Sequence, residues 1–560
     1  MRGRLPIALA TVACLIACGG APEPVAPSPP TVVLHALPSP PALDGSTPGA
    51  VYLNAVAQHI QPRWAQFLED CRVRLAASHA LNDMALVATA ELAIDRDGRL
   101  DVVRIETSGS ADFDFAVRDV LADAPLVEAP PVELLSDDDR VHLRWSFARD
   151  RRQAGAATAS LVRVERPLAA VIAKLLAAGE LARAARRVAA APPDDPARRP
   201  AIERVMLAAL HEALGGSGTD ARRFAVEAIG HVRATSLAAH VRPLASATLD
   251  REVRKAAIAT LAALDDTSSV EDLAAALPGE LRADPEVALA QVRALVALGR
   301  ADRARAIVRR ALDGGVLVGA LQAHAHAPDP AVTRRLAGWL ARGTAAVREA
   351  VCAAIPADGP ATLVLRGLRD RDASVRAACA DTAARRGRAG ATPAVTRRLH
   401  ELAADRDQRV RARAVAALAV IDPDAVVAAI SDPAAEVRVA AVPAAREPDL
   451  RQLAADDDAD VRAAALARLG DRADALRVAA VDDDAPQVRR VAARTIADPA
   501  LLSRLAADHA PEVASDALAR LVALRGRAAM TTSLLAELAA APVGSVERVR
   551  IALAWLSAPR

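Results

Sequence analysis

The sequence has few aromatic residues, almost no lysine and no excess of charge. Only 2% of its 560 residues are aromatic although 52% are hydrophobic, and Lys174 and Lys255 are the only lysines. Alanine supplies much of the hydrophobic fraction, and alanine-rich segments favour closely packed helices. Arg2 and Arg4 supply the formal net charge of +2. The remainder of the chain is neutral, which excludes the basic surface that nucleic-acid binding needs.

Motifs that carry chemistry are also missing. The sequence has no His-Glu-x-x-His pair, phosphate-binding loop or Gly-x-Ser-x-Gly turn. Its only His-Glu dipeptides, His211-Glu212 and His400-Glu401, lie too far apart in the sequence to share a metal ion. His324 and His326 alternate along one short stretch without a third ligand nearby. We therefore expect no catalytic site, no metal and no cofactor, and predict that the protein is not an enzyme.

Residues 1–17 have the composition of a secretory leader. Arg2 and Arg4 precede an apolar run, Leu5–Ile16, that is too short to span a bilayer as a permanent helix. The run leads into Ala17-Cys18-Gly19, which resembles a bacterial lipobox. The resemblance implies lipidation of Cys18 and, because Gly19 is not Asp, an outer-membrane lipoprotein that faces the periplasm. An ordinary secretory signal that is cleaved elsewhere is the alternative.

Residues 18–49 are rich in proline, alanine and serine. Such a segment has little to bury and adopts an extended, semi-rigid form. At roughly 3 Å per residue it could lift the first domain several nanometres from the lipid surface. We therefore expect a tether between the lipid anchor and the folded part of the chain.

Residues 50–150 hold most of the aromatic residues and mix helix and strand patterns. Their spacing predicts, in order, a helix, two strands, a helix and a strand, at residues 52–67, 86–94, 100–107, 112–121 and 141–147. Asp95–Gly98 predicts the hairpin turn between the first two strands, with Gly98 at positive φ. Asp112 is positioned to cap the second helix. We expect a small α+β domain.

This order and several residues resemble the C-terminal periplasmic domain of TonB-family proteins, which is also similar to that of TolA. The resemblance is carried by Tyr52, Val56, Ile60, Trp64, Asp97-Gly98, Ser108-Gly109, Phe113-Asp114, Ala116-Val117 and Pro130-Pro131. In that family the domain binds short extended segments of envelope proteins, often by adding a strand to a sheet edge. Here Tyr52-Leu53 replaces the family's Tyr-Pro, and the lipobox replaces the membrane-spanning helix of energy transducers. The resemblance therefore implies protein binding without energy transduction; a spacer domain with no partner is the alternative.

From residue 155 to 560 the patterns predict successive helices, and a Val-Arg pair recurs. The pairs are Val347-Arg348, Val375-Arg376, Val410-Arg411, Val437-Arg438, Val461-Arg462 and Val488-Arg489. Recurrence on this scale is the signature of a solenoid, in which each helix pair completes its core against its neighbours. The segment Asp370–Ala378 and its copies resemble HEAT repeats, with decayed copies at Val253-Arg254 and Val546–Arg550. We predict an all-α HEAT-repeat solenoid over 155–560.

Aspartate-rich turns and the arginines of the pairs are the main polar groups of these repeats. The turns lack the spacing of a calcium-binding EF-hand loop, so we interpret them as helix caps. In one repeat, Asp458 or Asp460 is expected to cap a helix that Gly470 ends. Each arginine either forms a ladder with neighbouring aspartates or lines a concave face for acidic ligands, and we favour the ladder.

Cys71, Cys352 and Cys379 follow the leader. Cys352 and Cys379 are one repeat apart, 27 residues, which predicts that they lie near each other on adjacent helices. In an oxidising envelope they can form a disulfide. We favour the alternative that they are small buried residues with free thiols.

Together these features predict a lipid-anchored cell-envelope protein that acts as a protein-binding scaffold. Lipid on Cys18 would attach it to a membrane, and the TonB-like domain and the solenoid would bind unidentified envelope proteins. Two binding surfaces on one anchored chain raise the effective concentration of an assembly. The alternative is a TonB-related accessory factor that contacts outer-membrane transporters.

Overall fold

The computed structural model describes residues 34–36, 48–124, 126–150, 158–216, 218–246 and 250–559. The chain divides into two compact units, Met1–Pro167 and Leu168–Arg560. The predicted signal peptide and Cys18 lie outside the described residues. So does the predicted tether, apart from residues 34–36 and 48–49.

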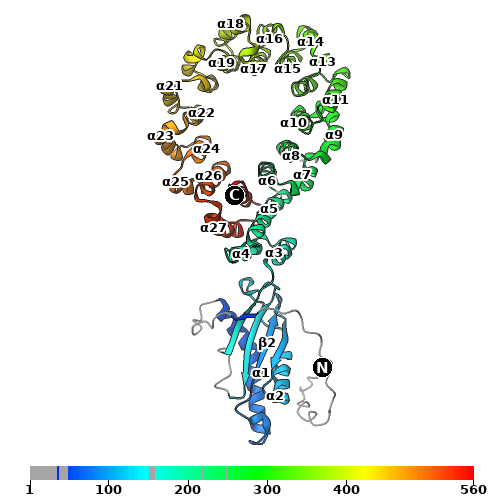
Figure 1. Ribbon diagram of the computed structural model, residues 1–560, viewed down its shortest axis with the longest axis vertical. Helices are drawn as coiled ribbons and strands as arrows, with labels where there is room; N and C mark the ends of the chain where they lie inside the picture. The colour runs from blue at the N-terminus through cyan, green and yellow to red at the C-terminus, as the bar shows by residue number, and fades with distance from the viewer. Residues whose placement is uncertain are drawn as a thin grey trace, which may run out of the picture. The chain divides into compact units, whose positions relative to one another are not determined.

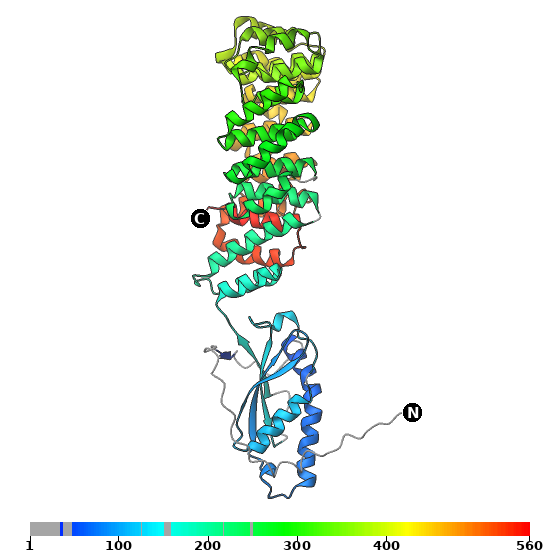
Figure 2. The ribbon, with the colours of Figure 1, turned by 90° about the vertical axis from the view of Figure 1, so that its right-hand side faces the viewer.

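The N-terminal unit is an antiparallel sheet with two helices, the α+β arrangement that the sequence predicts. Its main elements are α1 (Pro48–Arg74), β2 (Val87–Ile94), β3 (Leu100–Glu106), α2 (Ala111–Ala122) and β4 (Val141–Ala148), with short 3-10 helices η1 (Ala80–Asn82) and η2 (Val132–Leu134). Helices α1 and α2 pack together, and Trp64 meets Phe113 edge-on at 5.5 Å between ring centroids. These rings share one core with alternate residues of β2 and β4. Figure 2 shows the long helix α1 alongside the sheet.

The hairpin turn is confirmed, whereas the cap of α2 differs from the prediction. Asp95 Oδ1 accepts hydrogen bonds from the backbone N–H groups of Asp97 (3.0 Å) and Arg99 (2.9 Å), and Gly98 has φ of 81°. A Cβ at Gly98 would overlap the carbonyl oxygen of Val127, so only glycine fits this turn. Helix α2 is capped by Ser110, two residues before the predicted Asp112, which lies in the first turn instead.

One strand lies beyond the predicted domain boundary. Strand β5 (Ala159–Val164) pairs with β4, and the three-residue strand β1 (Leu34–Ala36) pairs with β5. The sheet order is therefore β1-β5-β4-β2-β3. The sequence predicts helices from residue 155, because β5 is short and its apolar residues do not alternate. Its strand conformation depends on β4 beside it, which a local pattern does not reveal.

The C-terminal unit consists of helices throughout its described residues. One series, the inner helices, faces the inside of the array in Figure 1, and each contacts the next member of the series. The inner helices are α6 (Thr219–His231), α8 (Arg251–Ala263), α10 (Pro285–Ala297), α12 (Val318–His324), α15 (Ala345–Ala354), α17 (Ala373–Gly390), α19 (Gln408–Ile421), α20 (Ala435–Ala441), α22 (Ala459–Leu469), α24 (Pro486–Thr495), α26 (Pro511–Arg525) and α28 (Val546–Ser557).

The remaining helices precede or alternate with the inner helices. The unit begins with α3 (Leu168–Ala177), α4 (Leu181–Ala189) and α5 (Arg198–Gly215). The intervening helices are α7 (Ala238–Ser246), α9 (Val270–Ala283), α11 (Ala301–Asp313), α13 (Pro330–Thr333), α14 (Leu336–Arg342), α16 (Ala361–Leu368), α18 (Pro393–Leu402), α21 (Glu447–Leu453), α23 (Asp474–Ala479), α25 (Pro499–Leu505) and α27 (Arg527–Ala540). Short 3-10 helices are η5 (Thr235–Leu237), η6 (Thr267–Ser269), η7 (Pro423–Ser431), η8 (Val442–Ala444), η9 (Gly470–Ala473) and η10 (Ala480–Asp482).

Helix α22 shows why these residues form a repeat. Of the two predicted caps, Asp458 is the one used: its side chain accepts hydrogen bonds from the N–H groups of Asp460 and Val461. Val461, Ala465 and Leu469 then form the buried stripe. Gly470, with φ of 55°, ends the helix as predicted. Small apolar residues let neighbouring helices approach closely, which explains how a unit so poor in aromatic residues builds a core.

The two ends of the helical unit meet. Helix α27 contacts α4, and α28 contacts both α5 and α6, so the array closes on itself as a ring (Figure 1). The predicted decayed repeat at Val546–Arg550 is the start of the closing helix α28. The repeat pattern predicts stacking between neighbours but not closure, because closure depends on the small rotation that accumulates from one repeat to the next.

Candidate binding surfaces

The arginines of the Val-Arg pairs form the ladder that the sequence favours. Each donates through Nε and Nη2 to both carboxylate oxygens of an aspartate in the next turn, over 2.6 to 3.0 Å. The six rungs are Arg348–Asp370, Arg376–Asp405, Arg411–Asp432, Arg438–Asp456, Arg462–Asp483 and Arg489–Asp508. Fork-shaped pairing of this kind fixes orientation as well as charge.

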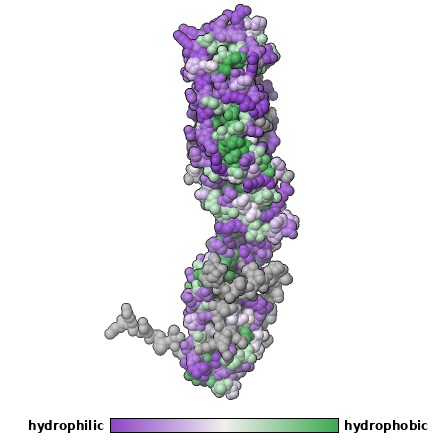
Figure 3. All heavy atoms as spheres, turned by 90° about the vertical axis from the view of Figure 1, so that its left-hand side faces the viewer, coloured by the Kyte–Doolittle hydropathy of each residue, from purple (hydrophilic) through white to green (hydrophobic). Residues whose placement is uncertain are grey.

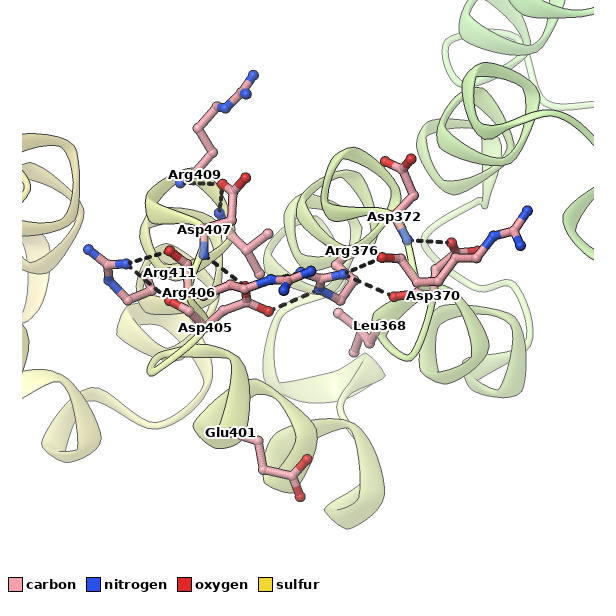
Figure 4. A network of polar contacts seen from close by, with 12 residues as sticks. Leu368, Asp370, Asp372, Arg376, Glu401, Asp405, Arg406, Asp407, Arg409 and Arg411 are labelled. Atoms are coloured by element: carbon pink, nitrogen blue, oxygen red, sulfur yellow. Dashed lines mark hydrogen bonds and ion pairs between the residues drawn. The ribbon is translucent and has the colours of Figure 1, made fainter.

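Every rung also fixes the turns at its two ends (Figure 4). Arg376 Nη1 donates to the carbonyl oxygen of Asp370 in its own turn over 3.1 Å. At the other end, Asp405 Oδ1 accepts from the backbone N–H of Asp407 over 3.0 Å, and Asp407 in turn caps α19. The arginine's donors are therefore satisfied within the framework, so these arginines are structural and do not present an acidic-ligand site.

Arginine bonding alters the titration of the ladder carboxylates. The hydrogen bonds from Arg462 lower the pKa of Asp483, and those from Arg489 lower the pKa of Asp508. Arg489 and Asp508 are the most enclosed rung, with 8% of each side chain exposed. Burial keeps the solvent from screening these pairs, so removing one partner should destabilise the fold more than breaking a surface salt bridge would.

A different salt bridge closes the ring. Arg548 of α28 donates through Nη1 to both oxygens of Glu212 on α5, over 2.7 and 2.8 Å. Glu212 also accepts from the backbone N–H of Gly544 over 2.6 Å. The Arg548 side chain is only 4% exposed. Sequence reasoning considered Glu212 only as part of a His-Glu dipeptide, because nothing local indicates a partner more than 300 residues away.

Trp555 strengthens the same closure. The Arg527 guanidinium of α27 lies over the Trp555 ring at 4.5 Å from its centroid, and Trp555 Nε1 donates to Thr531 Oγ1 over 3.1 Å. A buried tryptophan needs such a partner for its N–H group. Helices α27 and α28 are thus fixed to each other at the point where they meet the start of the unit.

Cys352 and Cys379 form a disulfide between α15 and α17, with both residues fully buried. The favoured prediction of two free thiols is therefore wrong, and the alternative is confirmed. Gly367 of α16 makes the room, because a Cβ there would overlap the Cys379 sulfur. Cys71 is buried with a free thiol, and burial raises its pKa.

The histidines and glutamates considered as metal ligands lie in separate places. His211 stacks edge-on against His240 at 4.3 Å, while His400 contacts Asp422 at 3.1 Å. His324 is buried between the Ala354 carbonyl and the Asp329 N–H, and burial lowers its pKa. Within the ranges that the structure describes, no three His, Cys, Asp or Glu side chains are arranged to hold a metal ion.

Among the described residues, β1 and β3 are the two outer strands of the N-terminal sheet, and β3 is the longer of the two. Strand β3 pairs with β2 on one side, and on the other only Arg99 has a partner, in an isolated bridge to Leu126. A register shift opposite Glu91 and Leu92 leaves Val103 without a partner, and it is 60% exposed. Residues 101–106 therefore present backbone groups to any extended segment that approaches this edge.

On the other side of the sheet, further strands lie beyond β4. The sequence predicts β4 as the last strand, which would leave β4 as a second edge. Instead β5 covers β4, and β1 from the proline-rich segment adds to β5 through Leu34–Ala36. This sheet thus accepts a short extended segment of its own chain at one side, and β3 is the longer outer strand at the other.

The surface of the helical unit has several hollows, of which two differ in their lining residues. A cavity of about 750 Å³ lies between α6, α8 and α10, with an alanine floor and charged residues such as Glu227 and Lys255 at its rim. A groove of about 560 Å³ lies beside α14 and is lined by Arg334, Arg335, Trp339 and Arg342. Sequence reasoning missed this groove; the available signal was Trp339, one of only three aromatic residues after position 167.

The face of the helical unit drawn in Figure 3 is largely hydrophilic, with hydrophobic areas that are separated from one another. Large apolar side chains exposed on this unit occur singly, as Val420, Val427, Val478, Leu524 and Val543 do. Isolated apolar residues are ordinary on protein surfaces. In the part of the chain that the structure describes, every helix is too short or too polar to cross a bilayer.

Comparisons with known proteins identify no family. No protein-family model matches the chain, and no curated protein does. One similar solved chain comes from a structure in which Kap95p binding induces the switch loops of RanGDP to adopt the GTP-bound conformation. It is 13% identical with a TM-score of 0.28, and the match covers 65% of this chain and 61% of that chain. A crystal structure of an engineered protein is 18% identical with a TM-score of 0.20, covering 64% and 98%. At these TM-scores neither likeness carries an argument.

Proposed function

We propose that the protein is a lipid-anchored scaffold of the bacterial cell envelope. It binds other envelope proteins through a TonB-like N-terminal domain and a ring of HEAT-type repeats, and it works by binding and not by catalysis. Lipid on Cys18 holds it to the membrane, on the periplasmic side of the outer membrane. Because both binding surfaces belong to one membrane-attached chain, two bound partners have a raised effective concentration for each other.

The unpaired edge of β3 is the observation that carries this proposal. Strand addition supplies affinity through backbone hydrogen bonds and specificity through neighbouring side chains. Exposed Val103 offers an apolar contact beside the free backbone groups. Arg104 and Arg144 both bond Glu106 at the end of the edge, and such charged groups discourage unspecific pairing.

Two further observations support the envelope location. The buried Cys352–Cys379 disulfide is typical of proteins that fold in oxidising compartments. The lipobox at Cys18 supports export and anchoring on the sequence alone. The ladder supports the scaffold role, because its arginines stabilise a framework and leave the recognition of partners to other surfaces.

A photo-crosslinking amino acid at position 103 tests the strand-edge proposal. In cells that express the full chain, we expect it to trap a partner protein covalently. The matched control is the same amino acid at position 73, because Val73 on α1 is equally exposed at 66% but lies away from any strand edge. Equal trapping at both positions, or none at position 103, would contradict strand addition.

Replacing the lipidated residue tests the anchor separately. Cys18→Ala should move the protein from the membrane fraction to the soluble fraction, because one or more acyl chains provide the attachment. Unchanged fractionation would refute the anchoring proposal. If the partner trapped at position 103 is an outer-membrane transporter, the alternative role as a TonB-related accessory factor is favoured over a general scaffold.

A further inference from the structure

The groove beside α14 has an unusual charge for this unit. It is lined by three arginines, Arg334, Arg335 and Arg342, together with Trp339, Leu317 and Val347, and no acidic side chain lines it. In the ladder, by contrast, each arginine is paired with a carboxylate. Asp313 pairs with Arg335, so the positive charge of the groove that has no partner among the described residues is that of Arg334 and Arg342.

The ladder register explains where this charge comes from. In six successive turns an aspartate stands five residues before the buried valine, as Asp370 precedes Val375 and Asp405 precedes Val410. In the turn before α15, the residue five positions before Val347 is Arg342. Thr344 still caps the helix and Arg348 still donates to the Gly343 carbonyl over 3.0 Å, so the turn keeps its geometry. Only the sign of the charge is reversed.

Trp339 lines the groove, and its side chain is restricted by its neighbours. The Arg335 guanidinium lies over its ring at 4.6 Å from the centroid. Asp313 fixes that guanidinium through a 2.6 Å hydrogen bond to Arg335 Nη1. Trp339 is half-buried against the helical core, which limits its rotation. A preorganised aromatic side chain costs little entropy on binding and is a common interface anchor.

Arg334 and Arg342 remain available for a ligand. Both are exposed, and neither side chain forms an ion pair within the described ranges of the chain. Guanidinium groups match the planar geometry of carboxylates and bind them through paired hydrogen bonds. An occupant should therefore carry negative charge at two points and an apolar group between them.

We propose that this groove binds an extended acidic segment of a partner protein, with carboxylates on Arg334 and Arg342 and an apolar side chain beside Trp339. The proposal deepens the scaffold function and rests on it. Helix α14 has seven residues and is therefore about 10 Å long; Arg342 is its last residue and Arg334 lies two residues before its first. An extended peptide covers that distance in about three residues, so the segment should have acidic residues on both sides of a short apolar stretch.

Charge and shape favour a peptide over other anions. A flat membrane surface would not reach a half-buried ring in a concave groove. Nucleic acid would require a longer positive track than three arginines provide, and the mature chain is close to neutral. A peptide supplies both the carboxylates and the apolar contact that this lining can satisfy.

A fluorescently labelled peptide with two glutamates flanking two leucines is the probe, titrated with the full-length protein and followed by fluorescence anisotropy. The double variant Arg334→Glu with Arg342→Glu should weaken binding about tenfold or more, because attraction becomes repulsion at both ends. Trp339→Ala should weaken it by a smaller factor. A glutamine version of the peptide should not bind measurably to the unaltered protein.

The matched control is Arg397→Glu with Arg468→Glu, which changes the same charge at exposed arginines elsewhere on the unit and should leave peptide binding unchanged. Equal weakening by the control, no binding of the acidic peptide, or binding of anionic phospholipid vesicles in its place would overturn the proposal. Crosslinking at position 103 and the Cys18→Ala fractionation would be unaffected by those outcomes, so failure here is distinguishable from failure of the scaffold function.

Discussion

The ladder and the ring closure join helices through the same chemistry over very different distances. In the ladder each arginine reaches a carboxylate 18 to 29 residues further along the chain. At the closure Arg548 reaches Glu212 across 336 residues. Loop entropy grows only with the logarithm of length, so this longer span costs about 2 kcal/mol more. A rung fixes the two turns at its ends, whereas the closure holds only if every repeat contributes the right rotation.

The largest effect is expected from breaking the closure. Arg548→Ala would leave Glu212 without its arginine in a mostly enclosed position, which should cost about 4 kcal/mol at the contact. Hydrogen exchange should accelerate in α28 and α5, and small-angle scattering should show a larger radius of gyration. Arg525→Ala removes an exposed arginine from α26 and serves as the control. Unchanged exchange in α5 would mean that apolar packing alone closes the ring.

Loss of the disulfide should have the second-largest effect on stability, because the disulfide joins the first two ladder helices, α15 and α17. Replacing Cys352 and Cys379 together by serine opens a loop of 27 residues, which should destabilise the unit by about 3 kcal/mol in urea unfolding. Cys71→Ser leaves this bond in place and controls for thiol loss. Peptide mapping without reductant should recover the linked pair; finding only free thiols at both positions would show that the bond does not form.

A single rung should matter less than the closure. Arg411→Ala leaves Asp432 with its remaining backbone contact, and both side chains are partly exposed, at 16% and 14%. We expect a loss of about 2 kcal/mol in urea unfolding. Arg409→Ala, two residues earlier on the exposed side of α19, should change the free energy of unfolding by less than about 0.5 kcal/mol. Equal losses in the free energy of unfolding for the two variants would contradict a structural role for the ladder.

Acid should weaken the ladder gradually. Because their folded-state pKa values are lowered, Asp483 and Asp508 contribute stability that is fully present above the ordinary carboxyl pKa of about 3.9. That stability is lost as the pH falls through the lowered values. Thermal unfolding of the helical unit should therefore shift to lower temperature as the pH falls below about 4. Arg489→Ala should reduce the pH dependence of thermal unfolding. An unchanged pH dependence would show that the Arg489–Asp508 rung does not cause it.

Local residues were sufficient to predict the repeats. Asp458, Val461 and Gly470 indicate the start, the buried stripe and the end of α22, because capping and helical spacing act within one turn. The order helix, strand, strand, helix, strand from α1 to β4 was visible for the same reason. Strand β5 was missed because its conformation comes from β4 beside it. Ser110 replaced the predicted Asp112 as a cap, a shift of two residues that spacing does not resolve.

The sequence by itself predicted the successive helices, favoured an arginine–aspartate ladder and predicted the hairpin at Gly98, since each depends on residues within one or two repeats. Only the tertiary structure decided the ring, the Glu212–Arg548 contact, the Cys352–Cys379 bond and the groove around Trp339. These features depend on the summed rotation of many helices and on how side chains fill the space between them. Neither the summed rotation nor the side-chain packing is determined by any one segment of the sequence.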